Sequence, residues 1–226
     1  MDDRLAEAQE RYEAAVFAGA TDGLDTADRA LDGVEADTAL ARGRIRHARF
    51  LATRSAGAAP GEDLTEIALF DRALALYQSL GDTRGEAEAL FWVGCYHQVV
   101  RGDMEATEAT FARSADLAAT AGDDLTRSYA LRHVAFAAQH AGRGADAQTA
   151  LAESTRLRRD LGFGAGVAAN LVAQAYFTAE GGPGDAGALL DEADRIAADA
   201  GADAVSGWVS EARAALLHKA VRTSST

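Results

Sequence analysis

One cysteine and two histidines are the side chains of this sequence whose types could support covalent chemistry. A thiol becomes a nucleophile when an imidazole lies beside it, and Cys95, His97 and His133 are the candidates. Cys95 and His97 would, however, point about 200° apart on a helix. A lone cysteine among aromatic and aliphatic neighbours more often packs in a core. The chain also lacks the P-loop, GxSxG and HExxH patterns, so we predict no catalytic residue.

The other metal-ligating residue types do not form a predicted site. Cys95 is the only cysteine, which leaves no disulfide and no CxxC motif within one chain. The pairs His133 with His140 and Asp123 with Asp124 lack the convergent spacing of a metal site. The sequence therefore predicts neither a bound metal nor a cofactor.

A local concentration of basic residues in the first quarter of the chain is the other chemically distinctive feature. Its guanidinium groups could hold an acidic peptide terminus or a phosphate. The alternative, which we favour, is that they form ion pairs with acidic residues of adjoining helices, such as Asp28, Asp32, Glu35 or Asp37. The basic concentration consists of Arg42, Arg44, Arg46, Arg49 and Arg54, together with His47.

Composition excludes several classes of protein. The chain has 226 residues, 48% of them hydrophobic, and a net charge of -13. This acidic balance argues against nucleic-acid binding, which needs clustered lysine and arginine. The N-terminus lacks the basic and then apolar order of a signal peptide, and the longest apolar stretch, 89–96, is shorter than the ~20 residues of a membrane helix. We therefore expect a cytoplasmic protein.

A repeated turn organises the chain. Gly81, Gly122 and Gly162, with a fainter copy at Gly201, recur about every 40 residues, a period typical of stacked helical repeats. We expect each of these glycines to end one helix, and Asp82 and Asp123 to cap the helix that follows.

Each period divides into two amphipathic segments around a short polar turn, which predicts a helical hairpin. The clear repeats span 81–121, 122–161 and 162–200. The first of them contains one extra residue. Its Gly94 and Gly102 are eight positions apart, whereas the corresponding Ala135 and Gly142 of the second repeat are seven positions apart. The second helix of each repeat carries a predicted stripe with the same steps of four, three and three residues. The stripes are Thr107, Phe111, Ser114 and Leu117 in the first repeat, Ala147, Leu151, Ser154 and Leu157 in the second, and Ala186, Leu190, Ala193 and Ile196 in the third.

The flanking segments predict further helices. Residues 36–80 are interpreted as another pair, 37–53 and 62–80, with a lengthened loop that contains Pro60. Residues 1–35 are interpreted as a degenerate N-terminal pair, 2–18 and 24–35. Residues 203–220 predict a capping helix of the kind that ends a repeat array, and 221–226 are expected to fray.

These residues resemble the tetratricopeptide repeat family, in particular its longer variant of about 40 residues found in bacterial regulators. Leu90, Gly94, Gly102-Asp103 and Phe111 are similar to the family signature, as are Leu131, Ala135, Gly142, Ala147 and Leu151 in the next copy. The resemblance implies an all-α fold, a right-handed α-solenoid of antiparallel helix pairs with a C-terminal capping helix. It also implies a concave groove lined by the first helix of each pair.

Projection of the stripe opposite the packed face selects the residues expected to line that groove. Their mixture of aromatic and polar side chains suits a peptide or a small amphipathic molecule. Leu171 and Ala175 would lie beyond them. The predicted groove residues are Arg44, His47, Phe91, Cys95, Tyr129, Arg132, Phe136 and Gln139.

The first hypothesis for function is a non-catalytic module that binds a protein or peptide segment in the groove, in a regulatory or scaffolding role. The alternative is a small-molecule-binding or enzymatic protein of specialised metabolism that uses the same groove, with His133, Arg132, Cys95 or Tyr129 as polar groups. A homo-oligomer formed through an exposed apolar end is a third possibility. Neither nucleic acid nor membrane is expected as a partner.

Overall fold

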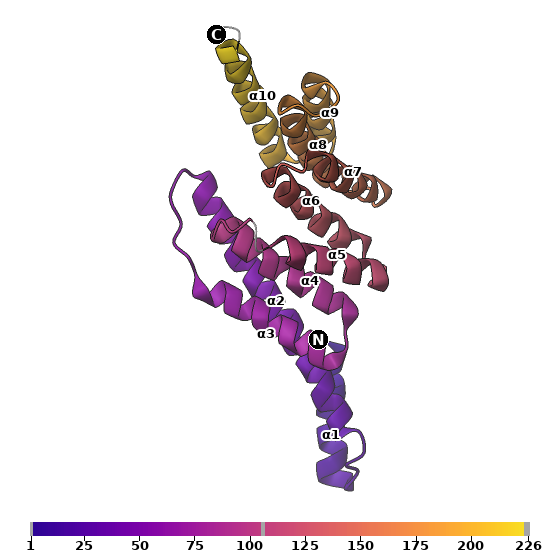
Figure 1. Cartoon of the computed structure of the whole chain (residues 1–226). Helices are drawn as coiled ribbons and strands as arrows, with labels where there is room; N and C mark the ends of the chain where they lie inside the picture. Colours follow the sequence, from indigo (N-terminus) through magenta and orange to yellow (C-terminus); the bar gives the residue numbers. More distant parts are fainter. Residues whose placement is uncertain (1, 105–106, 224–226) are drawn as a thin grey trace. The chain divides into compact units, whose positions relative to one another are not determined.

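A computed structural model describes residues 2–104 and 107–223, and within these ranges the regular structure is entirely helical. Consecutive helices pack against one another within each of two compact units (Figure 1). The chain divides into two compact units, residues 1–103 (unit 1) and 104–226 (unit 2). Each unit is described separately below.

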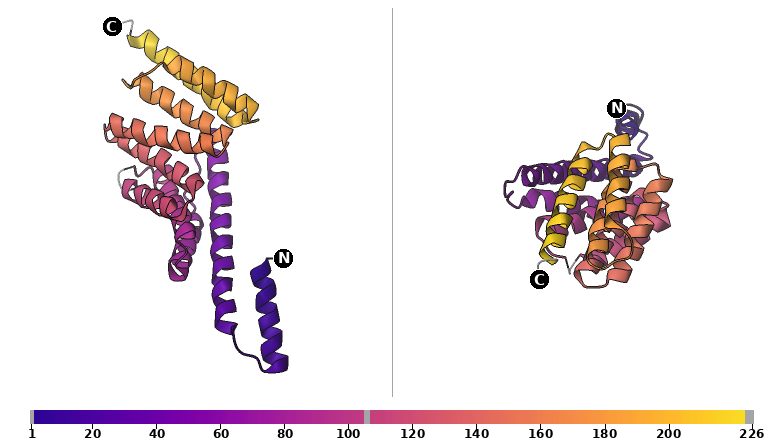
Figure 2. Two further views of the ribbon diagram at one scale, coloured as in Figure 1. Left: turned by 90° about the vertical axis from the view of Figure 1, so that its right-hand side faces the viewer. Right: turned by 90° about the horizontal axis from the view of Figure 1, so that it is seen from above.

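The described part of unit 1, residues 2–103, contains four α-helices. The short α1 packs against the first part of the much longer α2, as Figure 2 shows, and α3 packs against both α2 and α4. These helices are α1 (Asp3–Ala18), α2 (Leu24–Ser55), α3 (Leu64–Leu80) and α4 (Thr83–Cys95).

The α2 helix is continuous where the sequence analysis separates a helix at 24–35 from another at 37–53. The predicted break follows Gly33, but a glycine inside a helix costs only about 1 kcal/mol relative to alanine and does not end it. Gly33 also lies where a neighbour comes close, since a Cβ there would lie 3.1 Å from Nη1 of Arg4 on α1. The predicted N-terminal pair is therefore α1 with the first half of α2.

Among its described residues, unit 2 contains six α-helices, and two of its hairpins lie within the predicted repeats 122–161 and 162–200. The α6 helix packs against α7, and α8 packs against α9. The two pairs meet where α7 contacts α8, and α10 contacts both α8 and α9. The helices are α5 (Glu108–Ala121), α6 (Asp124–His140), α7 (Gly144–Asp160), α8 (Gly164–Ala179), α9 (Ala186–Asp199) and α10 (Asp203–Thr223). The α10 helix continues beyond its predicted end at 220, and 224–226 of the predicted tail lie outside the described residues.

The repeated glycines end helices as predicted. Gly81, Gly122, Gly162 and Gly201 have φ of 70°, 68°, 68° and 62°, the left-handed conformation that terminates a helix and that glycine adopts without strain. Asp82 then caps α4 by accepting from the backbone N of Gly85 at 2.9 Å, and Asp123 caps α6 by accepting from the backbone N of Thr126 at 3.0 Å.

The extra residue of the first clear repeat coincides with a π-helical turn. After α4, residues Tyr96–Val100 form the π-helix η1, in which each backbone bond spans five residues rather than four. A π-turn accommodates one inserted residue without ending the helix. This helix therefore continues to the turn at Gly102, in spite of its longer spacing.

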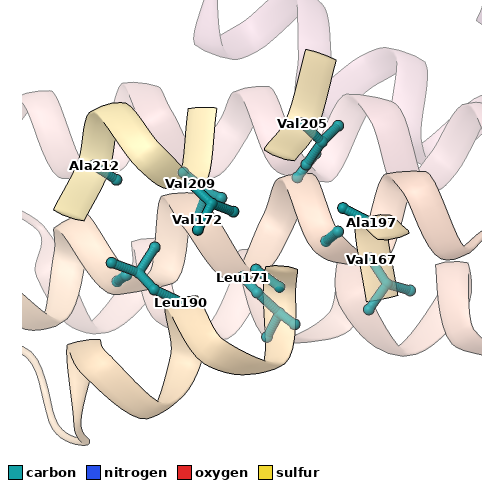
Figure 3. Close-up of a cluster of buried hydrophobic side chains, with 12 residues drawn as sticks. Val167, Leu171, Val172, Leu190, Ala197, Val205, Val209 and Ala212 are labelled. Carbon is teal, nitrogen blue, oxygen red and sulfur yellow. The ribbon is translucent and has the colours of Figure 1, made fainter. Parts of the chain in front are cut away.

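The predicted stripes are buried against neighbouring helices. In unit 2, Leu190 and Ala197 of α9 pack with Val167 and Leu171 of α8 and with Val209 of α10, as Figure 3 shows. Full burial of each valine or leucine contributes about 1.5–3 kcal/mol to folding. Because no helix pair encloses this cluster alone, α10 completes the core of the last repeat.

The residues four positions before and four positions after a terminating glycine are related in size. Where the first is large, the second is glycine. Four residues before Gly81 and Gly162 stand the large Tyr77 and Arg158, and four residues after them stand Gly85 and Gly166. A Cβ on Gly85 would lie 2.3 Å from the Tyr77 ring, and one on Gly166 would lie 2.4 Å from the Phe163 ring and 3.0 Å from Cδ of Arg158. Glycine at the second position therefore leaves room for Tyr77 in one repeat and for both Phe163 and Arg158 in the other.

None of the helices in the described ranges combines the length and the apolar character that crossing a bilayer would require.

Candidate functional site

Four of the predicted groove residues lie along one face of α6 in unit 2, and we call them the α6 face. All four side chains are partly buried. Each contacts a residue of α8 or one directly beside it, so the α6 face is also the packing seam between these helices. The contacts are Tyr129 with Phe163 (ring centroids 6.0 Å apart), Arg132 with Asn170 Oδ1 (2.7 Å), Phe136 with Phe177 (centroids 6.1 Å apart) and Gln139 with Glu180 Oε2 (2.7 Å).

Arg132 occupies the centre of the α6 face. Its Nη1 donates to the carbonyl oxygen of Ala169 at 2.8 Å as well as to Asn170, and its guanidinium carbon lies 4.7 Å from the centroid of the Phe136 ring. The guanidinium is thus held in one place by α8 and by its own helix, while its side chain keeps some exposure. Such a cation, fixed beside an aromatic ring, differs from a flexible surface charge in losing little side-chain freedom when it forms a further contact.

A second arginine, Arg158 of α7, lies deep inside unit 2. Only 2% of it is exposed, and it is the largest of the fully enclosed side chains. Its Nε donates to Oγ of Ser128 at 3.3 Å, and its Nη1 donates to the carbonyl oxygen of Gly166 and to Asn170 Oδ1, both at 2.9 Å. The guanidinium carbon also lies 4.9 Å from the centroid of the Tyr129 ring.

Asn170 of α8 joins the two arginines. Its Oδ1 accepts from Nη1 of both, and its Nδ2 donates to Oγ of Ser154 at 2.9 Å and to Oγ1 of Thr155 at 3.2 Å. Asn170 is fully buried. One amide side chain therefore uses both its oxygen and its nitrogen to organise a polar cluster inside unit 2.

Both guanidinium groups are positive at neutral pH, although burial opposes their charge. Burial lowers the pKa of Arg132 to about 9, with the charge of Arg158 acting in the same direction. Burial likewise lowers the pKa of Arg158 to about 10. Within the described ranges neither arginine forms an ion pair with a carboxylate. A buried, uncompensated charge costs on the order of several kcal/mol, so this arrangement is unfavourable by itself.

Helical periodicity in the sequence indicates Arg132 as a site residue but indicates neither Arg158 nor Asn170. Arg158 lies four residues before its terminating glycine. In the other repeats this position is occupied by Tyr77, Ala118 and Ala197, which are all buried. An arginine at a position that is apolar in every other copy is the signal that could have identified it. Asn170 had no comparable signal.

The remaining predicted groove residues belong to unit 1, and three of them are buried. His47, Phe91 and Cys95 are 5%, 4% and 3% exposed. Arg44 is exposed, pairs with Oε1 of Glu88 at 3.0 Å and lies 5.6 Å from the centroid of the Trp92 ring. In this unit the predicted stripe is therefore mainly interior. On α8, Leu171 and Ala175 likewise belong to the hydrophobic core.

Cys95 has the environment of a packed residue rather than of a nucleophile. Burial raises the pKa of its thiol well above the usual value, and the nearby charge of Glu66 acts in the same direction. Because the thiolate is the reactive form, this thiol is protonated and inert at neutral pH.

The basic concentration of residues 42–54 forms ion pairs, but with other partners than those expected. Nη1 of Arg46 pairs with Asp63, and Arg44 pairs with Glu88, as above. Arg54 lies over the ring of Phe50. The acidic residues expected as partners pair elsewhere, Glu35 with Arg72 and Asp37 with Arg4. The ion pairs of Arg44 and Arg46 therefore join this part of α2 to α4 and to the N-cap residue of α3.

His47 and Glu66 form a buried polar pair between α2 and α3. Nδ1 of His47 lies 2.8 Å from Oε1 of Glu66, and both side chains are almost fully enclosed. Burial raises the pKa of Glu66, while the hydrogen bond with His47 and the charge of Arg46 act in the opposite direction.

We expect the Glu66→Gln variant to be more stable than the native protein at neutral pH. A carboxyl whose pKa is raised by folding stabilises fully only below its ordinary pKa of 4.5, and that contribution is lost as the pH rises through the folded-state pKa. Glutamine keeps the shape and the hydrogen bond without titrating. Urea midpoints measured from neutral pH down to pH 4 should show the difference shrinking. A less stable variant at neutral pH would show that the charged pair with His47 outweighs the cost of burial.

A separate hollow of about 380 Å³ lies between α7, α8 and α9. It is lined by apolar side chains such as Phe177 and Leu189 and by polar ones such as Gln148 and Gln174. Within the described part of the chain, no three or more histidine, cysteine or acidic side chains are grouped to hold a metal ion.

Comparison with known proteins assigns no family to the chain. A scan of protein-family models finds no match, and a search of curated proteins finds no similar sequence.

Proposed function

We propose that this chain is a non-catalytic helical-repeat module that binds a protein or peptide segment against the α6 face, in a regulatory or scaffolding role. The observation that carries the proposal is the α6 face itself, where a fixed arginine stands between two partly exposed aromatic rings, Tyr129 and Phe136. Arginine and aromatic residues dominate the binding energy of protein interfaces.

The helix pairs support the same proposal at the level of the fold. Consecutive hairpins of about 40 residues are the building plan of tetratricopeptide-like solenoids, whose first helices line a right-handed concave groove. The α6 helix is the first helix of its pair, as that plan requires. We propose a cytoplasmic protein of this class, whose partner carries the biological output.

Selection of a random peptide library on the full-length chain tests the proposal. We expect a selected peptide to slow amide hydrogen exchange in α6 and α8, and to bind Phe136→Ala at least about tenfold more weakly, a loss typical of an interface anchor. Trp208→Ala is the matched control, because Trp208 is an exposed aromatic residue of α10, 45% accessible. Protection confined to other helices, or equal binding to Phe136→Ala, would contradict the proposal.

The hollow between α7, α8 and α9 favours a second candidate function, the binding of a small molecule. Its volume falls within the roughly 300–1,000 Å³ of ligand pockets, and its lining is mixed apolar and amide. Leu189→Trp would fill it. If a small-molecule screen finds binders that this variant loses while peptide binding persists, the hollow is a site of its own.

A further inference from the structure

Arg132 and Arg158 differ from three more exposed arginines of unit 2 in what neutralises them. Arg127, Arg156 and Arg159 are considerably more exposed, and each pairs with a carboxylate. The two buried arginines, for which a counter-charge would matter most, have only neutral acceptors within the residues that the structure describes. A role in stability would predict the opposite distribution.

The geometry concentrates the two charges. Both Nη1 atoms donate to the same oxygen, Asn170 Oδ1, at 2.7 and 2.9 Å, so the guanidinium groups converge on one point. Nη2 of Arg158 is buried and has no hydrogen-bond acceptor among the residues that the structure describes. The result is a fixed double positive charge with unused donor capacity, in which Arg132 is the less enclosed of the two residues.

We propose that Arg132 and Arg158 together bind a phosphate group of the ligand. A phosphate monoester carries a charge of about -1.5 to -2 near neutral pH and three strong acceptor oxygens, which matches two guanidinium charges. A single carboxylate would neutralise one of them. The phosphate reaches Arg132 from the α6 face, with the charge of Arg158 behind it. This inference deepens the proposed function and rests on it for the location of the ligand.

Free ions test the phosphate site without any peptide. Thermal unfolding of the full-length chain is compared in inorganic phosphate, acetate and chloride at equal ionic strength. We expect phosphate to raise the midpoint by about 2–4 °C at about five times its Kd, and acetate to do no more than chloride. Arg132→Met and Arg158→Met should lose the response. Arg156→Met is the matched control, with the same change of charge on an exposed arginine of α7.

A second variant keeps the test decisive if the methionine variants fold poorly. Asn170→Asp places a carboxylate at the point where both arginines converge, and it therefore replaces the proposed ligand. We expect its midpoint in chloride to exceed that of the native protein, and its response to phosphate to be lost. The proposal is overturned if acetate acts like phosphate, if Arg132→Met responds normally, or if Asn170→Asp is the less stable protein.

Two further probes identify the source of the phosphate. A library-selected peptide is compared in serine and phosphoserine forms, and ribose 5-phosphate represents small monoesters. Stronger binding of the phosphoserine form indicates a modified protein segment, and stronger binding of ribose 5-phosphate indicates a metabolite. If inorganic phosphate binds but no peptide protects α6, the peptide proposal fails alone. If a peptide binds native protein and Arg132→Met equally, with no phosphate response, the phosphate inference fails alone.

Discussion

Replacement of Asn170 by leucine is expected to lower the free energy of unfolding by about 3–5 kcal/mol, the range for removing one partner from a buried charged network. The leucine would remove the acceptor that both arginines share and the donor to Ser154 and Thr155. Two guanidinium groups would then remain inside unit 2 with fewer acceptors. Urea unfolding followed by circular dichroism measures the loss.

Gln174→Leu provides the matched control for this prediction. It makes the same change from amide to leucine about one turn further along α8, where the side chain lines the hollow of unit 2 rather than the arginine pair. We expect a change within about 0.5 kcal/mol, as for surface substitutions outside a network. Similar losses in both variants would show that Asn170 contributes as an ordinary helix residue and not as the centre of the cluster.

Phe70→Ala is expected to destabilise unit 1 by about 3–5 kcal/mol, the range for a phenylalanine removed from a closed core. Phe70 is fully buried on α3, and its ring stacks on Trp92 with centroids 5.7 Å apart. Leu64→Ala is the control on the same helix, because Leu64 is 63% exposed. Its effect should stay within about 0.5 kcal/mol.

A double-mutant cycle with Gly43 tests why that core is so sensitive. A Cβ on Gly43 would lie 2.4 Å from the Phe70 ring, so Gly43→Ala alone should cost about 1–3 kcal/mol by overpacking. In the Phe70→Ala background the same methyl group has room. The two changes should therefore be non-additive, with a coupling of at least about 0.5 kcal/mol. Strict additivity would mean that the cost of the added methyl group does not come from the Phe70 ring.

The helix pairs could be predicted because their signals are local. Terminating glycines, capping aspartates and the three- and four-residue steps of the stripes each act within a few residues, so the hairpins of 122–161 and 162–200 agree closely with α6 to α9. The break expected between residues 35 and 37 was wrong. Packing of α1 and α3 on α2 is a tertiary effect, and it decides whether the helix continues.

The candidate site was predictable only in part. Helical periodicity placed Tyr129, Arg132, Phe136 and Gln139 on one face of α6, and they do share that face. Periodicity could not show that this face contacts α8, because that depends on how one hairpin packs on the next. In unit 1 the same projection selected His47 and Cys95, which are interior, since neighbouring helices cover the sides of α2 and α4 that carry these two residues.

By itself, the sequence determined that this protein is a series of helical hairpins about 40 residues long, because the residues that begin, end and pair helices are neighbours along the chain. Only the tertiary structure decided that Arg132 and Arg158 meet at Asn170. Three helices bring these side chains together, and local propensity carries no information about a convergence of charges from α6, α7 and α8. The packing of hairpins thus turns three unremarkable polar residues into the chemically distinctive point of unit 2.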